Sequence, residues 1–192
     1  MRSQQPPSPT WTVFLNHHVE DLVSVDFFVV PTVRFRVLFV LVILAHYRRR
    51  VLHFDVTEHP TAQWTGSRLL RCFHGIRRRN TSFGIEMSFY RSQFQRRLKS
   101  QGIQEVLTAP RSLCQNSFVE RVIGSIRRDC LDHVIVLNER HLKRIATSYF
   151  NYYDRWQTHL SLGMDSPESR EVQPRAPGKV VQFPEAGGLS SL

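Results

Sequence analysis

The stretch "LVSVDFFVV", residues 22–30, decides the fold, because it has the composition of a strand in a largely buried sheet. Two more runs rich in β-branched and aromatic residues follow, "VRFRVLFVLVILA" at 33–45 and "RRRVLHFDVT" at 48–57. The gaps that separate the three runs are short. Such short connections predict three neighbouring antiparallel strands.

A helical spacing of apolar residues follows Pro60 and predicts a helix that includes Leu69 and Phe73. The elements expected farther along are a helix at 91–102, a strand at 103–109, and helices at 118–133 and 138–156, the last one capped by Asn138. This order predicts an α/β fold with one mixed sheet, three antiparallel strands and then parallel strands, flanked by helices. The segment 74–90 has to supply the fourth strand.

Composition divides the chain into three regions. Residues 1–20 begin with a Pro-rich polar stretch and are interpreted as a linker or a cut end. Residues 21–162 are the predicted folded core, and residues 163–192 accumulate Pro, Gly and Ser, which predicts an extended tail.

The charge balance favours a polyanionic partner. Lys and Arg number 26 against 16 acidic residues, which gives a formal net charge of +10 and a pI near 10.4. Nucleic acid is the expected partner, ahead of an anionic membrane surface. The alternative is that the charge serves solubility alone.

Cysteine usage and hydropathy indicate a soluble protein of the reducing cytoplasm. Cys72, Cys114 and Cys130 form no CxxC pair, so neither a disulfide framework nor a zinc knuckle is predicted. The apolar run at 37–45 is too short to span a bilayer. The first residues lack the apolar region of a signal peptide. We therefore expect no membrane partner.

Two carboxylates stand out as candidate catalytic groups. Asp26 interrupts an apolar strand, where an ionised group is costly unless it is paired or binds a metal ion; the alternative is a half-exposed strand face. Glu120 lies near the start of a predicted helix, and Arg127 returns to nearly the same helix face with Gly124 between them. A carboxylate and a guanidinium beside a bare backbone suit a metal ion and a phosphate. The alternative is an ordinary solvated helix face.

Three segments together resemble the integrase core shared by retroviral integrases and bacterial insertion-sequence transposases. "LTAPRSLCQNSFVERVIGSIRRDCLDH" resembles the glutamate-bearing segment, and "VSVDFF" resembles the strand that carries the first aspartate. "YYDRWQTHLSLGMDSP" is similar to the pattern that closes the bacterial members. The resemblance covers most of residues 20–170 and implies a ribonuclease-H-like fold, a DNA-integrating activity and a bacterial cytosolic location.

The family uses two aspartates and a glutamate to hold two divalent ions, Mg²⁺ or Mn²⁺, that promote in-line attack on a phosphodiester. The resemblance makes Asp26 the first acid and Glu120 the third. It also implies DNA as a partner and a possible homo-oligomer. The residues it predicts to contact DNA are Asn116, Arg121, Arg127, Arg128 and Arg155.

The second aspartate is missing. The family spacing places it about five residues before an aromatic residue, which Tyr90 matches, and this position holds Ile85. The flanking "RRRNTSFG" is unlike a buried strand. Glu86 is one residue out of register, and adjacent strand residues point to opposite faces, so we do not expect it to substitute. Asp55 and Glu58 are interpreted as a surface charge and a turn residue.

A frameshift accounts for both the missing aspartate and the segment that is unlike a buried strand. When the codons of residues 74–89 are read from their third bases, chosen among synonymous codons, the translation becomes "WDTAPKYLIRDRDVI". If the codon of Phe73 ends in C, a proline precedes it and the sequence becomes "PWDTAPKYLIRDRDVI". This text contains an apolar strand and places an aspartate at position 85. That aspartate requires only a G as the third base of the Gly84 codon, because every isoleucine codon begins with AT. We hypothesise one base lost near Phe73 and one gained near Phe89.

The sequence therefore predicts a degenerate, truncated integrase or transposase core with strongly impaired catalysis. The alternative is a non-enzymatic nucleic-acid-binding protein on the same fold. An unrelated hydrolase is a weaker interpretation, since the histidines form no recognisable nucleophile constellation.

Overall fold

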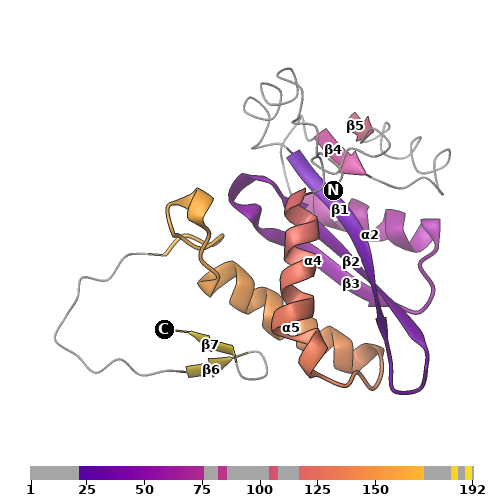
Figure 1. The fold of residues 1–192 in the computed structure, drawn as a ribbon. Helices are drawn as coiled ribbons and strands as arrows, with labels where there is room; N and C mark the ends of the chain where they lie inside the picture. Colours follow the sequence, from indigo (N-terminus) through magenta and orange to yellow (C-terminus); the bar gives the residue numbers. More distant parts are fainter. Residues whose placement is uncertain are drawn as a thin grey trace, which may run out of the picture.

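The computed structural model describes residues 22–75, 82–85, 104–107, 117–170, 183–185 and 189–191. Its centre is a mixed five-stranded sheet with the strand order β3-β2-β1-β4-β5. Helix α2 covers one face of this sheet, and helices α4 and α5 lie on the other (Figure 1). None of the described helices is long and apolar enough to cross a bilayer.

The strands of the sheet are β1 (Leu22–Pro31), β2 (Val37–Ala45), β3 (Val51–Thr57), β4 (Ser82–Ile85) and β5 (Gln104–Leu107). The helices are α2 (Ala62–Gly75), α4 (Ser117–Asp129) and α5 (Glu139–Trp156), with short 3-10 turns η1 (Tyr47–Arg49), η2 (Leu131–His133) and η3 (Leu160–Leu162). Strands β6 (Phe183–Glu185) and β7 (Leu189–Ser191) form a separate antiparallel pair.

Sheet topology confirms the predicted mixed α/β fold. β1 pairs with β2, and β2 with β3, in the antiparallel sense. β4 then pairs with β1 in the parallel sense, in a register that sets Ile85 opposite Val25. β5 is parallel to β4. The segment 74–90 thus supplies the expected parallel strand.

Alternation along the strands gives the sheet two apolar faces. Phe28 on β1 packs in a large cluster with residues of α4 and α5, among them Ile126 and Tyr149. Val25 faces the other way, into a smaller cluster with Leu69 of α2. Because β1 is buried on both sides, a polar residue on it needs a specific environment.

Three predicted boundaries were wrong, in each case because the chain turns where its composition is still strand-like or helical. β2 begins at Val37 rather than at 33, since Thr32 and Arg36 close a tight turn in which Phe35 has a φ of 57°. β3 begins at Val51 because η1 occupies the preceding residues. α4 ends at Asp129, four residues earlier than predicted, because the next residues form the 3-10 turn η2.

The predicted start of the last helix is confirmed. The Asn138 side chain accepts a hydrogen bond from the backbone N–H of His141 at 2.9 Å, as an N-cap should. The helix expected at 91–102 lies outside the described residues.

Candidate active site

Asp26 lies on the central strand, just past the point where the pairing of β1 with β4 ends at Val25. Its side chain shares the sheet face of Ser24 and Phe28, which is the face that α4 covers. It is half-buried, and its Oδ1 atom accepts a hydrogen bond from the backbone N–H of Phe27 at 2.7 Å. Asp26 is therefore held at the carboxyl end of a parallel strand pair, where ligands of open α/β sheets bind.

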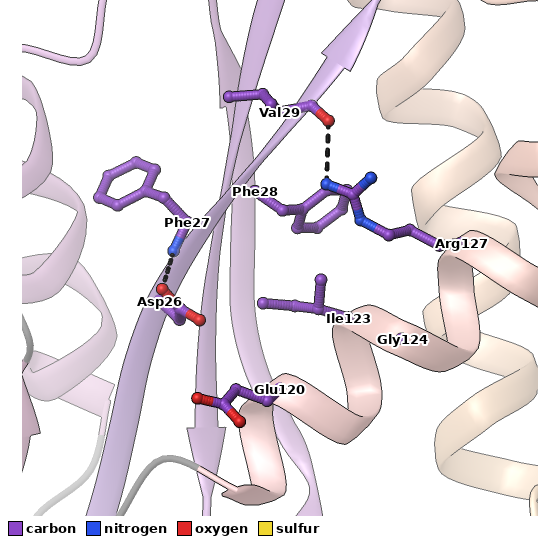
Figure 2. A pocket seen from close by; sticks show the side chains of 8 residues that line it. All are labelled: Asp26, Phe27, Phe28, Val29, Glu120, Ile123, Gly124 and Arg127. Carbon is purple, nitrogen blue, oxygen red and sulfur yellow. Dashed lines mark hydrogen bonds between the residues drawn. The ribbon is translucent and has the colours of Figure 1, made fainter. Parts of the chain in front are cut away.

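Glu120 comes from the first turn of α4 and lines the same cleft as Asp26. The cleft has a volume of about 430 Å³, and Figure 2 shows the two carboxylates directed toward each other across it. Its lining consists of Asp26, Phe27, Phe28, Val29, Glu120, Ile123, Gly124 and Arg127. Two acids about 95 residues apart in the sequence thus meet at one opening.

Arg127 closes the far end of the cleft from Glu120 (Figure 2). Its Nη2 group donates to the backbone carbonyl of Val29 at 3.2 Å, and its guanidinium carbon lies 5.4 Å from the centre of the Phe28 ring. Gly124 lies between Glu120 and Arg127 and adds no side chain to the cleft. The cleft therefore has a negative end and a positive end, with the Ile123 side chain and the Gly124 backbone between them.

The other predicted DNA contacts do not gather around this cleft. Arg121 and Arg128 are exposed on a neighbouring face of α4 and line a second cavity. Arg155, near the end of α5, forms an ion pair with Glu168 at 3.5 Å. Asn116 lies outside the described residues.

Position 85, where the sequence resemblance expects the second acid, falls at the end of β4. Ile85 is the last residue of β4 and stands opposite Val25, the neighbour of Asp26. Among the described residues, no three His, Cys, Asp or Glu side chains are grouped so that they could hold a metal ion. Glu86 lies outside the described residues. The described part of the site thus contains two carboxylate side chains, those of Asp26 and Glu120, that could bind a metal ion.

Asp55 is not the surface charge that its position in the sequence suggested. It is 4% exposed and forms ion pairs with Arg68 of α2 at 2.5 Å and Lys143 of α5 at 2.7 Å. The hydrogen bond from Lys143 and the nearby positive charges lower the pKa of Asp55, against the opposing effect of burial. Because its two partners come from opposite faces of the sheet, Asp55 ties α2 and α5 together around the β3 edge. Glu58 pairs with exposed Arg36 at 3.1 Å.

Sequence reasoning missed one group of polar residues, in the second cavity. Arg49 from η1 and His159 from the loop after α5 lie there with Arg121 and Arg128. They are more than 100 residues apart and fit no helical or strand spacing, so no local signal identifies them.

This arrangement of sheet and helices is the ribonuclease-H-like fold of integrases and transposases, as comparison with known structures shows. The catalytic domain of Mos1 mariner transposase, solved with raltegravir and Mg, superimposes with a TM-score of 0.61 at 13% identity, over 74% of this chain and 79% of that one. The HTLV-2 integrase catalytic core domain, solved with magnesium in a dimeric form, gives 0.55 at 13% identity, over 78% and 94%.

An intasome of simian T-cell lymphotropic virus, in complex with PP2A regulatory subunit B56 gamma, gives a TM-score of 0.58 at 16% identity. The match covers 85% of this chain and 60% of the viral chain, so this chain spans less than two thirds of that relative. In sequence, residues 101–167 match the family described as "Integrase core domain". No curated protein matches the chain.

Proposed function

We propose that this chain is the catalytic core of a bacterial insertion-sequence transposase that acts on DNA in integration or transposition, in a degenerate copy that lacks the second catalytic aspartate. The observation that carries the proposal is the meeting of Asp26 and Glu120 across one cleft. These residues lie on the strand and the helix that the integrase resemblance assigns to the first and third acids. The net charge of +10 suits a DNA partner.

The donor set suits a single hydrated ion better than a pair of ions. Carboxylate oxygens are the ligands that Mg²⁺ and Mn²⁺ prefer, and Mg²⁺ is often held by one or two carboxylates with water and substrate phosphate completing its shell. Asp26 and Glu120 satisfy that requirement. A second ion needs a further donor, and position 85 holds an isoleucine, which has no ligand atom in its side chain. Within the part of the chain that the structure describes, the donor set of a two-ion clamp is therefore incomplete.

The remaining groups of the cleft suit a phosphodiester substrate. Arg127 presents a guanidinium that is already oriented by the Val29 carbonyl, so little conformational freedom is lost when it donates to a phosphate oxygen. Gly124 leaves room for the sugar-phosphate backbone to approach α4. A phosphate bound by Arg127 would then lie in the same cleft as Asp26 and Glu120, the two residues proposed to hold the metal ion.

The frameshift supplies the reason for the missing acid. It predicts that the gene's codons at 74–89 have third bases compatible with "PWDTAPKYLIRDRDVI" in the shifted frame. Sequencing the gene tests this directly. A third base other than G in the Gly84 codon would contradict the hypothesis, because that base decides the aspartate at position 85.

The activity test compares Mn²⁺-dependent nicking of supercoiled plasmid by four proteins. These are the wild type, Asp26→Asn, Ile85→Asp, and a replacement variant in which residues 74–89 are changed to the shifted-frame sequence "PWDTAPKYLIRDRDVI". We expect the wild type to equal Asp26→Asn, and the replacement variant to exceed both by about 100-fold or more, the order of one charged transition-state contact. Robust wild-type nicking that Asp26→Asn abolishes would contradict degeneracy. A replacement variant no better than Asp26→Asn would contradict the proposed active site.

The second candidate is a non-enzymatic nucleic-acid-binding protein on the same fold, which the two-donor site and the basic charge favour. It predicts salt-sensitive DNA binding that Asp26→Asn or Glu120→Gln leaves unchanged or tightens slightly, because each substitution removes a negative charge. It also predicts no gain of nicking in the replacement variant.

A further inference from the structure

A second cavity lies on the other side of α4 from the carboxylate cleft, and its polar lining is cationic. It has a volume of about 270 Å³ and is bordered by η1, α4 and the end of α5 with the loop that follows it. The nitrogen-bearing side chains among the described residues that line it are those of Arg49, Arg121, Arg128, Gln157 and His159, and none of these described residues carries a carboxylate. A water occupies about 30 Å³ in the liquid, so the space accommodates a tetrahedral anion with some of its hydration.

The arginines of this cavity have no acidic partner among the residues that the structure describes. The ion pairs formed within the described residues join other arginines and lysines to acids, and none includes Arg49, Arg121 or Arg128. Arg49 is half-buried with its guanidinium carbon 4.6 Å from the centre of the Phe118 ring. Burial lowers the pKa of Arg49, Tyr153 partly offsets this effect, and the charge of Arg121 lowers the pKa further. A bound anion would relieve this repulsion.

His159 adds a buried polar atom that lacks a hydrogen-bond partner in the described structure. Its Nε2 atom is sealed from solvent, and its ring packs edge-on against Tyr153 at 5.2 Å between ring centres. Burial, and secondarily the charge of Arg49, lower the pKa of His159, which favours the neutral ring. His159 therefore lines the cavity as a neutral ring whose Nε2 atom is enclosed by protein.

α4 connects this cavity to the carboxylate cleft. Glu120 and Arg127 face the cleft, while the next residues, Arg121 and Arg128, are turned by about 100° and face the cavity. Gly124 lies between the two: a Cβ atom there would come within 3.1 Å of the Arg128 Nη1 atom. The missing side chain thus lets the Arg128 guanidinium lie against the helix.

We propose that this cavity binds a phosphate group of the nucleic-acid backbone, at a position on the DNA separate from the phosphodiester in the carboxylate cleft. The inference rests on the proposed function, because it takes DNA to be the partner. Arg49, Arg121 and Arg128 supply charge and fork geometry for phosphate oxygens, and the neutral His159 ring forms part of the wall. The site positions DNA and does not read its sequence.

The test measures binding of a fluorescent duplex by anisotropy across a series of NaCl concentrations in EDTA. EDTA removes divalent ions, so a metal ion bound by Asp26 and Glu120 does not contribute to the measured affinity. Losing one phosphate contact should reduce the slope of log K against log salt by about 0.9. We expect this reduction for Arg128→Gln and for Arg49→Gln. Arg140→Gln, which removes the same charge from an exposed position on α5, should leave the slope unchanged.

A thermal shift with inorganic phosphate, against chloride at equal ionic strength, separates the two sources of the anion. We expect phosphate to stabilise the wild type and Arg140→Gln, and to stabilise Arg128→Gln and Arg49→Gln less. Stabilisation by phosphate with salt slopes unchanged would overturn the assignment to nucleic acid. Equal slopes and equal shifts in all proteins would overturn the site while leaving the proposed function intact. A wild type that does not bind DNA would overturn both.

Discussion

Asp154 shows how one half-buried carboxylate can make the stability of this fold depend on pH. It lies on α5, where its Oδ1 atom accepts a hydrogen bond from the backbone N–H of Val51 at 3.1 Å. Desolvation raises the pKa of Asp154 from 3.8 to about 6, although the Val51 hydrogen bond and the charge of Arg50 oppose this. The folded state therefore prefers the protonated acid, while the unfolded chain ionises it at its ordinary pKa.

The resulting stability contribution is full below about pH 3.8 and is lost as the pH rises through about 6. Asp154→Asn keeps an acceptor for Val51 and removes the ionisation. We expect it to raise the free energy of unfolding at pH 8 by on the order of 2 kcal/mol relative to wild type, and to give no such gain at pH 4. Urea denaturation at the two pH values measures the difference. The exposed Asp132→Asn is the control, and an equal gain at both pH values would contradict the cause.

At the scale of the element, local pattern identified the strands and helices that place the two acids, since burial on both sides forces an apolar run and helix faces repeat every 3.6 residues. The errors lie where long-range contacts take over. From the sequence, Asp55 is interpreted as a surface charge. In the structure it forms ion pairs with Arg68 of α2 and Lys143 of α5, which are distant from it in the sequence. The cavity formed by Arg49 and His159 exists only because η1 and the loop after α5 come together in three dimensions.

The N-cap of α5 is a local feature whose contribution can be measured. Asn138→Ala removes the acceptor for the His141 N–H, so we expect a loss of about 1 kcal/mol in the free energy of unfolding. Asn138→Ser retains a capping oxygen and should lose only a few tenths. Ser148→Ala, at an exposed position inside the same helix, is the matched control and should not destabilise. A loss of the same size in Asn138→Ser would show that the side chain acts through something other than the cap.

At the scale of the whole molecule, Arg48 joins the residues after η3 to the turn between β2 and β3. Its guanidinium donates to the Asp165 carboxylate at 2.5 Å and to the carbonyls of Ser166 and Pro167 at 2.8 and 2.9 Å. The Asp165 pair, with the hydrogen bonds from Ser169 and Ser166, lowers the pKa of Asp165. The Ser-Pro motif was recognised in the sequence by resemblance alone. Its structural role depends on a contact more than 100 residues away, which no local pattern reveals.

A lysine cannot reproduce this fork of three donors, although it keeps the charge and tolerates the same positive φ of 55° no worse than arginine does. We therefore expect Arg48→Lys to reduce the free energy of unfolding by roughly 1 to 2 kcal/mol, measured by urea denaturation. Arg50→Lys, at an exposed neighbouring position, should change it by less than about 0.5 kcal/mol. Equal effects of the two substitutions would contradict a specific role for Arg48.

The largest apolar cluster joins residues 28–56 directly to residues 119–153. Asp26 and Glu120 lie on elements that this cluster joins, so we expect their mutual position to depend on the cluster rather than on the segment between the two parts.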